Sequence, residues 1–393
     1  MNSDPVVILA ARRTPVGAFQ GVFAGVTAPQ LGSAAIRASL ADAGVPASEV
    51  DEVIMGCVLS AGLGQAPARQ AALGAGIPAS VPSTTVNKMC GSAMRAVMSA
   101  ADQILAGSAQ IIVAGGLESM TNAPYLLPKA RAGYRMGNQE VLDHMFYDGL
   151  QSPWDGKLMG CFAEATSEKY GFTRKAQDDY AAESVRRALA AIKNGDFAAE
   201  VTPVTAKSRK GEALVDQDET PLTLDIAKIP TLKPAFKKDG TVTAASSAGI
   251  SDGAAALVLT RASFAASHGL KPLARIVAYA SFAREPEWFT LAPVGAIQRV
   301  LAKADWQAKD VDLYEINEAF AAVPMAAIKD LALDPAKVNV NGGACALGHP
   351  IGATGARIMT TLLHALRARG RKRGVASLCI GGGEATAIAL ELM

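Results

Sequence analysis

The chain has 393 residues, half of them hydrophobic, and a formal net charge of +2 at pH 7. Such a near-neutral chain gives no indication of bulk nucleic-acid binding, and no apolar run reaches the ~20 residues that span a bilayer. The N-terminal stretch MNSDPVVILAARRTP lacks a basic segment followed by an apolar core, so no secretory signal is predicted. We expect a cytoplasmic α/β enzyme with two domains or one large duplicated one.

The cysteines and histidines argue against a metal centre. Five cysteines, an odd number, form no C-x-x-C pair, and only four histidines accompany them. A disulfide framework and a zinc site are therefore not expected, nor is any resident cofactor. A free thiol is usually a small buried hydrophobe, so each cysteine has to be judged by its context. The five are Cys57, Cys90, Cys161, Cys345 and Cys379.

In chain order, strands and helices alternate, and the C-terminal part repeats the order of the N-terminal part. The N-terminal strands are expected at 6–13, 49–59, 83–89 and 109–119, with helices at 29–44, 66–75 and 90–106. The C-terminal strands are expected at 273–281, 310–317, 338–343 and 375–383, with helices at 292–305, 318–331 and 354–370. One more apolar strand completes each half, at 253–260 and at 384–392.

This alternation indicates βαβ units and parallel sheets that are buried on both faces. The repeat indicates two such halves, packed as a layered αβαβα body. The segment between them is richer in charge, Gly and Pro, and it is too long for a bare loop, so it should carry its own helices. The expected division is 1–121 plus 244–271 for the N-terminal half, 122–243 for an inserted loop domain, and 272–393 for the C-terminal half.

Cys90 stands where a predicted strand turns into a helix, followed by Gly91 and Ser92. The thiolate is the reactive form of cysteine, and aligned N–H dipoles at a helix N-terminus lower a thiol's pKa. The small residues leave room for a substrate. The sequence therefore predicts a nucleophile, with a buried cap residue as the alternative.

His349 lies in GHPIGATG, a loop dense in Gly and Pro that would hold the side chain in one place. If the halves are superposed, its turn matches that of Cys90, and the junction of two such halves is where α/β folds tend to bind ligands. The alternative is a core histidine bonded to a carbonyl.

Cys379 ends the strand of SLCIGGGEA, and a second thiol in the same pocket suits a reaction that moves a proton to or from carbon. The glycines Gly381–Gly383 leave backbone N–H groups free for an oxyanion. The alternative is a buried cysteine in a tight turn. Asn317, in EINEAFAA, is predicted as a helix N-cap or as a group that orients a water or a carbonyl, and Glu318 as a first-turn acid.

Together these segments closely resemble the thiolase family, over essentially the whole chain. The matching motifs are VNKMCGS around Cys90, NEAFA at 317–321, GHPIGATGAR around His349 and CIGGGEA around Cys379, with GGLESMTNAPY and DGTVTAASSAGISDGAAALV. The resemblance implies a duplicated αβαβα fold with an inserted loop domain. It also implies a reversible Claisen condensation of two acetyl-CoA to acetoacetyl-CoA and CoA, with thiolysis as the reverse.

The resemblance also implies roles for the candidate residues. Cys90 would carry the acetyl group as a thioester in a ping-pong cycle, and His349 would take its proton. His349 and a water held by Asn317 would form one oxyanion hole. Cys379 would remove the α-proton of the second acetyl-CoA, and the backbone N–H groups of Cys90 and Gly381 would form the other hole. Coenzyme A would be substrate and product rather than cofactor.

Substrate contacts are implied residue by residue. The candidate positions are Leu158, Met159, Phe236, Ala248, Phe289, Ala319 and Phe320. Three of these positions depart from the family pattern: Leu158 replaces a His, Ala248 a Ser and Phe289 a Met. These departures affect what can be expected of the CoA contacts and of the acyl length accepted. The basic stretches 207–210 and 233–238 are candidates for phosphate contacts, although such runs are more often solvated.

Other functions remain as alternatives at this point. A thiolase of broader chain-length range is one, and a decarboxylating ketoacyl synthase would need a second His or an Asn where Cys379 stands. A non-catalytic CoA- or lipid-binding protein would not need the intact trio of Cys90, His349 and Cys379, and a plain cysteine hydrolase would not need the second thiol.

The expected partners are acetyl-CoA, acetoacetyl-CoA and CoA, with no nucleic acid and no membrane. The loop 122–137 resembles a tetramerising segment, so a homotetramer built as a dimer of dimers is predicted.

Overall fold

The computed structural model describes residues 4–208 and 211–393. Its main sheet runs in the order β12-β13-β14-β11-β1-β10-β5-β3-β4, with β2 paired to β10. These strands are β1 (Val6–Arg13), β2 (Gly17–Ala18), β3 (Glu52–Gly56), β4 (Ser83–Val86), β5 (Ile112–Ser119), β10 (Ser251–Arg261), β11 (Ala274–Ala283), β12 (Leu313–Ile316), β13 (Arg373–Ile380) and β14 (Glu384–Leu392). Two half-sheets join where β1 meets β11 over two residue pairs.

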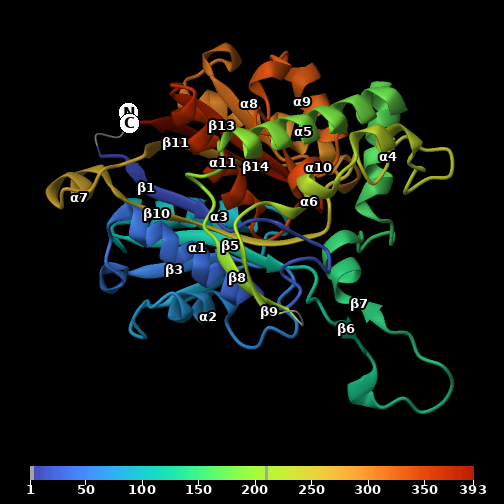
Figure 1. Cartoon of the computed structure of the whole chain (residues 1–393), viewed down its shortest axis with the longest axis horizontal. Helices are drawn as coiled ribbons and strands as arrows, with labels where there is room; N and C mark the ends of the chain where they lie inside the picture. The colour runs from blue at the N-terminus through green and yellow to red at the C-terminus, as the bar shows by residue number, and fades with distance from the viewer. Residues whose placement is uncertain (1–3, 209–210) are drawn as a thin grey trace.

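Helices cover the half-sheets on both faces and fill the space between them (Figure 1). They are α1 (Ala28–Ala43), α2 (Pro67–Gly74), α3 (Ser92–Ala106), α4 (Met159–Tyr170), α5 (Arg174–Asn194), α6 (Glu219–Thr223), α7 (Ala262–Ser267), α8 (Ala292–Ala304), α9 (Ala322–Leu331), α10 (Ala344–Leu347) and α11 (Thr354–Ala368). One core holds α3 and α11 against inner faces of both half-sheets. A second core packs α1 and α2 on the N-terminal half, and a third packs α8 and α9 on the C-terminal half. The predicted αβαβα layering is confirmed.

Local sequence signals explain the helix ends. Thr27 caps α1 in a reciprocal capping box with Gln30, Pro29 stands in its first turn, and Gly44 ends it in the left-handed conformation. These are the residues that satisfy free N–H and C=O groups at helix termini. The capping residues therefore explain why α1 begins and ends close to the bounds predicted from its hydrophobic pattern.

The prediction of parallel sheets was wrong in part. β3 runs parallel to β4 and β5, and β12 to β13, but β10 and β14 run antiparallel to their neighbours. β14 follows β13 after only Gly381–Gly383, and so short a turn permits only an antiparallel return. Each half-sheet is therefore mixed.

The strand predicted at 338–343 does not form. Only Val338 makes a single bridge, to Tyr314. The next residue, Asn339, has a positive φ of 50°. Its side chain accepts from the N–H of Ile316 at 2.8 Å and donates to the carbonyl of Ile316 at 2.8 Å. An amide side chain thus takes the place of a backbone ladder.

The segment between the halves carries α4, α5 and α6 and two small sheets. β6 (Tyr125–Leu126) pairs with β7 (Leu142–Asp143), and β8 (Val204–Ser208) with β9 (Gly211–Val215). The arm that bears β6 and β7 projects from the body at the lower right of Figure 1. Tyr125, Leu127 and Met136 are exposed along it. The three-part domain division stays a prediction. None of the helices in the described ranges has the length and apolar character to cross a membrane.

Candidate active site

Cys90 lies in the tight turn between β4 and α3, which begins at Ser92 rather than at Cys90 itself. The preceding residue, Met89, has a φ of 46°, a left-handed conformation that is uncommon for a residue with a side chain. Two hydrogen bonds hold the turn. The N–H of Met89 donates to Asn87 Oδ1 at 2.9 Å, and the N–H of Gly91 donates to the Lys88 carbonyl at 3.0 Å. Strain of this kind is often stored at functional sites.

The Cys90 thiol is protonated at neutral pH. Burial raises its pKa to about 11, and hydrogen bonds from the backbone N–H groups of Gly381 and Cys90 oppose that rise. The expectation that the helix N-terminus lowers this pKa was wrong, because desolvation of the sulfur outweighs the nearby N–H groups. Attack by Cys90 therefore needs a base.

His349 can serve as that base. Its Nδ1 lies 2.6 Å from Thr354 Oγ1, and that hydroxyl donates to the Pro350 carbonyl at 2.9 Å. The hydroxyl oxygen must then accept from Nδ1–H, which leaves Nε2 with its lone pair. Nε2 is buried and has no partner within the described ranges. Burial, aided by the charge of Arg357, lowers the pKa of His349 to about 3, so the ring is neutral at pH 7.

Cys379 lies near the end of β13 and is fully buried. Burial raises the pKa of its thiol well above the usual value, and the charge that Cys90 would carry as a thiolate adds to that rise. Gly381, two residues on, directs its N–H at the Cys90 sulfur. Two separate motifs, one with Cys90 and one with Cys379 and Gly381, thus contribute to the same part of the structure.

Close packing holds the turns of the two cysteines together. A Cβ on Gly91 would lie 2.4 Å from Ile380 Cδ1, so a larger residue here would displace the Ile380 side chain. An ion pair between Lys88 and Glu384 also joins the Cys90 turn to the start of β14. The two halves of the chain therefore fix the site jointly.

Asn317 follows β12 and is 1 % exposed, but it is not a helix cap. α9 begins at Ala322 with Ala321 as its cap residue, so the N-cap prediction for Asn317 was wrong. The side-chain Oδ1 of Asn317 accepts from Arg357 Nη2 at 3.4 Å. Its Nδ2 has no partner among the residues described and is the free donor of the amide.

Glu318 is likewise not a first-turn acid. Its buried carboxylate accepts from Tyr180 Oη at 3.0 Å, Ser184 Oγ at 2.7 Å, Asn339 Nδ2 at 2.9 Å and the N–H of Cys345 at 3.0 Å. The sequence around Glu318 could not predict this role, because the partners of its carboxylate come from α5 and from the segment before His349. The Cys345 thiol is buried here and donates to the Glu318 carbonyl at 3.7 Å.

An apolar cavity of about 340 Å³ leads to this site. Its lining includes His349 and five of the predicted substrate contacts, namely Leu158, Met159, Phe236, Ala248 and Phe320. Cys90 packs against the apolar cluster that contains Met120 and Ile351, two further residues of the lining. The shape and apolar character of the cavity suit a narrow, flexible chain.

Two predicted contacts lie behind this lining. Phe289 is 3 % exposed and packs edge-to-face on Phe162, with ring centroids 6.2 Å apart. The carbonyl of Ala319 accepts from the N–H of Ala248 at 3.0 Å. Ala319 thus bonds a residue of the lining, Ala248, whereas Phe162, the partner of Phe289, is not part of the lining. The basic stretch 207–210 has no described side chains, and Lys237 in the other stretch is exposed.

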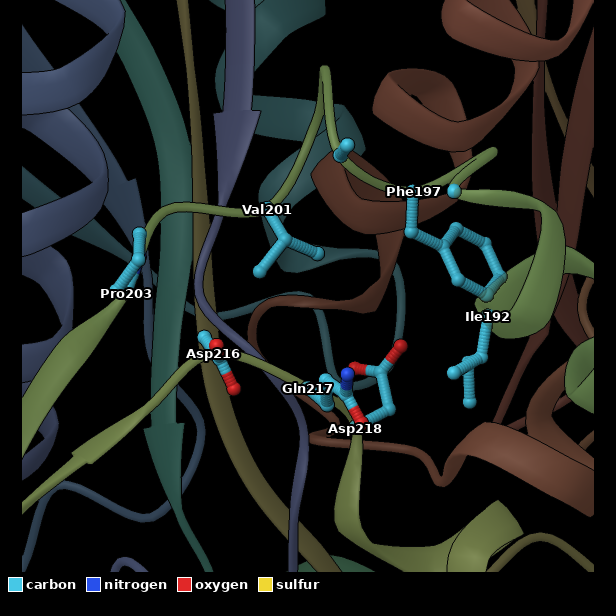
Figure 2. A pocket seen from close by; sticks show the side chains of 9 residues that line it. Ile192, Phe197, Val201, Pro203, Asp216, Gln217 and Asp218 are labelled. Atoms are coloured by element: carbon cyan, nitrogen blue, oxygen red, sulfur yellow. The ribbon is translucent and has the colours of Figure 1, made fainter.

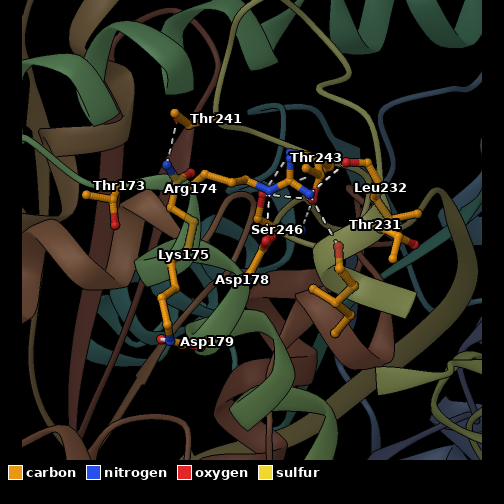
Figure 3. Close-up of polar contacts among 12 residues, drawn as sticks. Thr173, Arg174, Lys175, Asp178, Asp179, Thr231, Leu232, Thr241, Thr243 and Ser246 are labelled. Carbon is orange, nitrogen blue, oxygen red and sulfur yellow. Dashed lines mark hydrogen bonds and ion pairs between the residues drawn. The ribbon is translucent and has the colours of Figure 1, made fainter. Parts of the chain in front are cut away.

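The cavity wall from 229 to 248 is fixed to α5 (Figure 3). Arg174 donates to the Leu232 carbonyl at 2.7 Å and to Asp178 at 2.8 Å. Farther along this wall, the N–H of Thr243 donates to Ser246 Oγ at 2.9 Å. These bonds set the segment that carries Phe236 and Ala248.

A second cavity, of about 300 Å³, lies away from these residues (Figure 2). It is lined by Ile192, Gly195, Phe197, Ala198, Val201, Pro203, Asp216, Gln217 and Asp218. Both oxygens of Asp218 are bound by Arg13, at 2.7 and 2.9 Å. The carboxylate is thus committed to the interior, and none of the predicted site residues lines this cavity.

Glu118 was not singled out from the sequence, although it stands in a motif that carried the resemblance. Its carboxylate accepts from the backbone N–H groups of Val58 at 3.0 Å, Leu59 at 3.1 Å and Gly352 at 2.8 Å. Burial raises its pKa to about 7 despite these donors. Glu118 therefore ties the His349 loop to the N-terminal half. In the described ranges, no three His, Cys, Asp or Glu side chains gather to hold a metal ion.

Comparisons with known proteins agree with this geometry. The family profile described as "Thiolase, N-terminal domain" matches residues 6–263, and "Thiolase, C-terminal domain" matches 270–392. A Pseudomonas aeruginosa protein named acetyl-CoA acetyltransferase is 51% identical and is covered over 98% of both chains. Acetyl-CoA acetyltransferase 2 of Arabidopsis thaliana is 50% identical over 100% of this chain and 98% of that one.

Solved structures give the same result. The acetyl-CoA acetyltransferase of Bacillus anthracis has a TM-score of 0.97 and 44% identity, covering 99% of both chains. The Acat5 thiolase of Ascaris suum, solved in complex with coenzyme A, has a TM-score of 0.94 and 42% identity, covering 99% of this chain and 100% of that one. The chain belongs to the thiolase family and is an acyltransferase.

Proposed function

We propose that this protein is an acetyl-CoA C-acetyltransferase, which condenses two acetyl-CoA to acetoacetyl-CoA and CoA and also catalyses the reverse thiolysis. The proposal is supported chiefly by the approach of Cys379 and the Gly381 N–H to the Cys90 thiol, beside an apolar cavity that His349 lines. One thiol suffices for acyl transfer alone, whereas carbon–carbon bond formation also needs a group that moves a proton at carbon.

In the first half-reaction, Cys90 attacks the thioester carbonyl of acetyl-CoA as its proton passes to His349 Nε2. The carbonyl π bond breaks, and the resulting oxyanion is stabilised by the N–H groups of Cys90 and Gly381. When this intermediate collapses, the bond to CoA sulfur breaks and CoA leaves with the proton from His349. Acetyl-Cys90 remains, which makes the cycle ping-pong.

In the second half-reaction, Cys379 passes its proton to His349 Nε2, and the resulting thiolate removes a methyl proton from a second acetyl-CoA. The enolate oxygen is stabilised by His349 and by a water held on Asn317 Nδ2. The enolate carbon attacks acetyl-Cys90, the thioester bond breaks, and acetoacetyl-CoA forms. The Cys90 thiolate then recovers a proton from Cys379, and Cys379 recovers its own proton from His349, which restores both thiols and the neutral imidazole.

Coenzyme A thioesters fit the cavity as substrates. The pantetheine arm is narrow and flexible, and the cavity is apolar and lined by residues of α4 and of the segment 235–250. The CoA complex of the Ascaris suum thiolase supports this assignment.

The test is a peptide mass map after brief incubation with acetyl-CoA, of the wild-type chain beside Cys379→Ala. An acetyl group should appear on the peptide of Cys90 and accumulate in the variant, because deacetylation by condensation is blocked. Labelling only by longer acyl-CoAs would instead favour the thiolase of broader chain-length range. No label from any acyl-CoA would sink the enzyme assignment in favour of a binding role.

The homotetramer and the cytoplasmic location stay predictions. The arm 122–142 projects from the body and exposes apolar side chains that a second dimer would cover (Figure 1). Light scattering of the full chain should give the mass of four copies, and a monomer mass would refute the assembly.

A further inference from the structure

Arg357 is a buried cation to which the chemistry above gives no role. It lies on α11, three residues after the Thr354 that holds His349, and is 2 % exposed. Its Nη2 donates to Asn317 Oδ1 at 3.4 Å. The same helix thus contacts both side chains that would stabilise the enolate.

The contact decides which way the Asn317 amide points. A guanidinium carries donors only, so the amide atom that faces Arg357 must be the oxygen. The opposite orientation would set an N–H against an N–H of a cation. Oδ1 is thereby committed, and Nδ2 is left as the free donor.

Arg357 is costly to bury and is incompletely paired. Glu315 Oε2 lies 3.8 Å from its Nη1, which is an ion pair but too long for a hydrogen bond. Its Nε and Nη1 have no hydrogen-bond partner in the residues described. The next acid, Glu200, is bound by Arg13 at 2.6 Å and by Thr361 at 3.1 Å. A buried charge held this loosely stabilises the fold little, so a functional reason for it is favoured.

Arg357 also acts on the base. Its charge is the second cause, after burial, that lowers the pKa of His349. Glu315 does not cancel the charge fully, because burial raises the pKa of that carboxyl to about 8. The guanidinium therefore helps to keep the imidazole neutral.

We propose that Arg357 is a positioning residue of this acyltransferase, whose guanidinium fixes the amide of Asn317 with Nδ2 presented as the oxyanion-hole donor. The inference rests on the proposed function, because it gives Asn317 its place in the enolate step. Arg357 itself touches neither substrate nor reacting atom, but it orients Asn317, which does.

The test is a double-mutant cycle of Arg357→Met with Asn317→Ala, read by kcat for acetoacetyl-CoA formation. Arg357→Met alone should lower kcat by roughly 10²-fold, the scale of one lost oxyanion donor. In the Asn317→Ala background it should lower kcat by less than about threefold, since the group it positions is gone. KM should hold, because Arg357 does not line the cavity. Arg357→Lys, which keeps a donor and the charge, should recover part of the loss.

Thr360→Val is the matched control, because Thr360 is also buried on α11 but bonds only its own helix, at Ala356. Its kcat should stay at the wild-type value. The neutral form of Glu315 is accessible near pH 7, so Arg357→Met should fold; thermal unfolding checks this. Losses that multiply independently in the double variant would overturn the inference and leave the proposed function standing. If the wild-type chain forms no acetoacetyl-CoA, both the role of Arg357 and the proposed function are refuted.

Discussion

Replacing Cys90 with alanine should abolish acetyl transfer, lowering turnover of acetoacetyl-CoA by roughly 10⁵-fold, as removal of a catalytic nucleophile does elsewhere. The sulfur is the atom on which the N–H groups of Cys90 and Gly381 converge, and no other described thiol has that setting. Cys379 remains in the variant, but its burial and high pKa make it a poor nucleophile. Turnover measured by acetoacetyl-CoA absorbance, in both directions, gives the result.

Binding separates this loss from a loss of fold. Cys90 does not line the apolar cavity, so Cys90→Ala should bind CoA with wild-type affinity in calorimetry. Cys161→Ala is the matched control, because Cys161 is also partly exposed but lies on α4, and its turnover should be unchanged. Residual turnover above about 1% of wild type in Cys90→Ala would show that another group carries the acetyl intermediate.

The sequence predicted the parts of this molecule whose signal is local. Cys90, His349 and Cys379 stand at strand ends and turns that the hydrophobic pattern and the glycines mark, and the structure places them at those points. The layering followed from the repeat of strands and helices. Each of these features depends on residues within a few positions of one another.

Features that depend on distant partners were missed. Asn317 looked like a cap because Asn before a helix usually is one, but its partner Arg357 is forty positions away. Glu318 and Asn339 form their bonds with α5 and β12. The antiparallel strands followed from a three-residue turn whose geometry outweighs the βαβ pattern. Side-chain chemistry at long range is not visible in periodicity.

Electrostatics was the least predictable property, and it determines how the site must work. The dipole at the start of α3 suggested a thiolate, whereas burial keeps Cys90 a thiol, with a pKa of about 11, and keeps His349 a neutral base, with a pKa of about 3. Both groups therefore hold one protonation state across the physiological range. The proton has to move during attack rather than before it.

His349→Gln should expose that dependence on the base. Glutamine can keep the contact with Thr354 but cannot take a proton, so Cys90 acetylation at pH 7 should fall by roughly 10³-fold, within the range of general-base effects. In the wild-type chain neither Cys90 nor His349 titrates from pH 6 to 9, so the rate should change far less there, by no more than Glu118 and Glu315, with pKa values of about 7 and 8, cause as they titrate. In the variant only the thiolate reacts, and its fraction rises tenfold with each pH unit below about 11.

Single-turnover acetylation in a Cys379→Ala background measures this directly, because the acetyl group then stays on Cys90. The rate of His349→Gln should rise about 10³-fold from pH 6 to 9, following the thiolate fraction. His364→Gln is the control, because His364 is the buried histidine bonded to the Ala11 carbonyl at 3.0 Å, outside the site. A flat profile in His349→Gln would mean that another group takes the proton. An equally steep profile in the wild type would mean that the buried pair titrates nearer to neutrality than its desolvation implies.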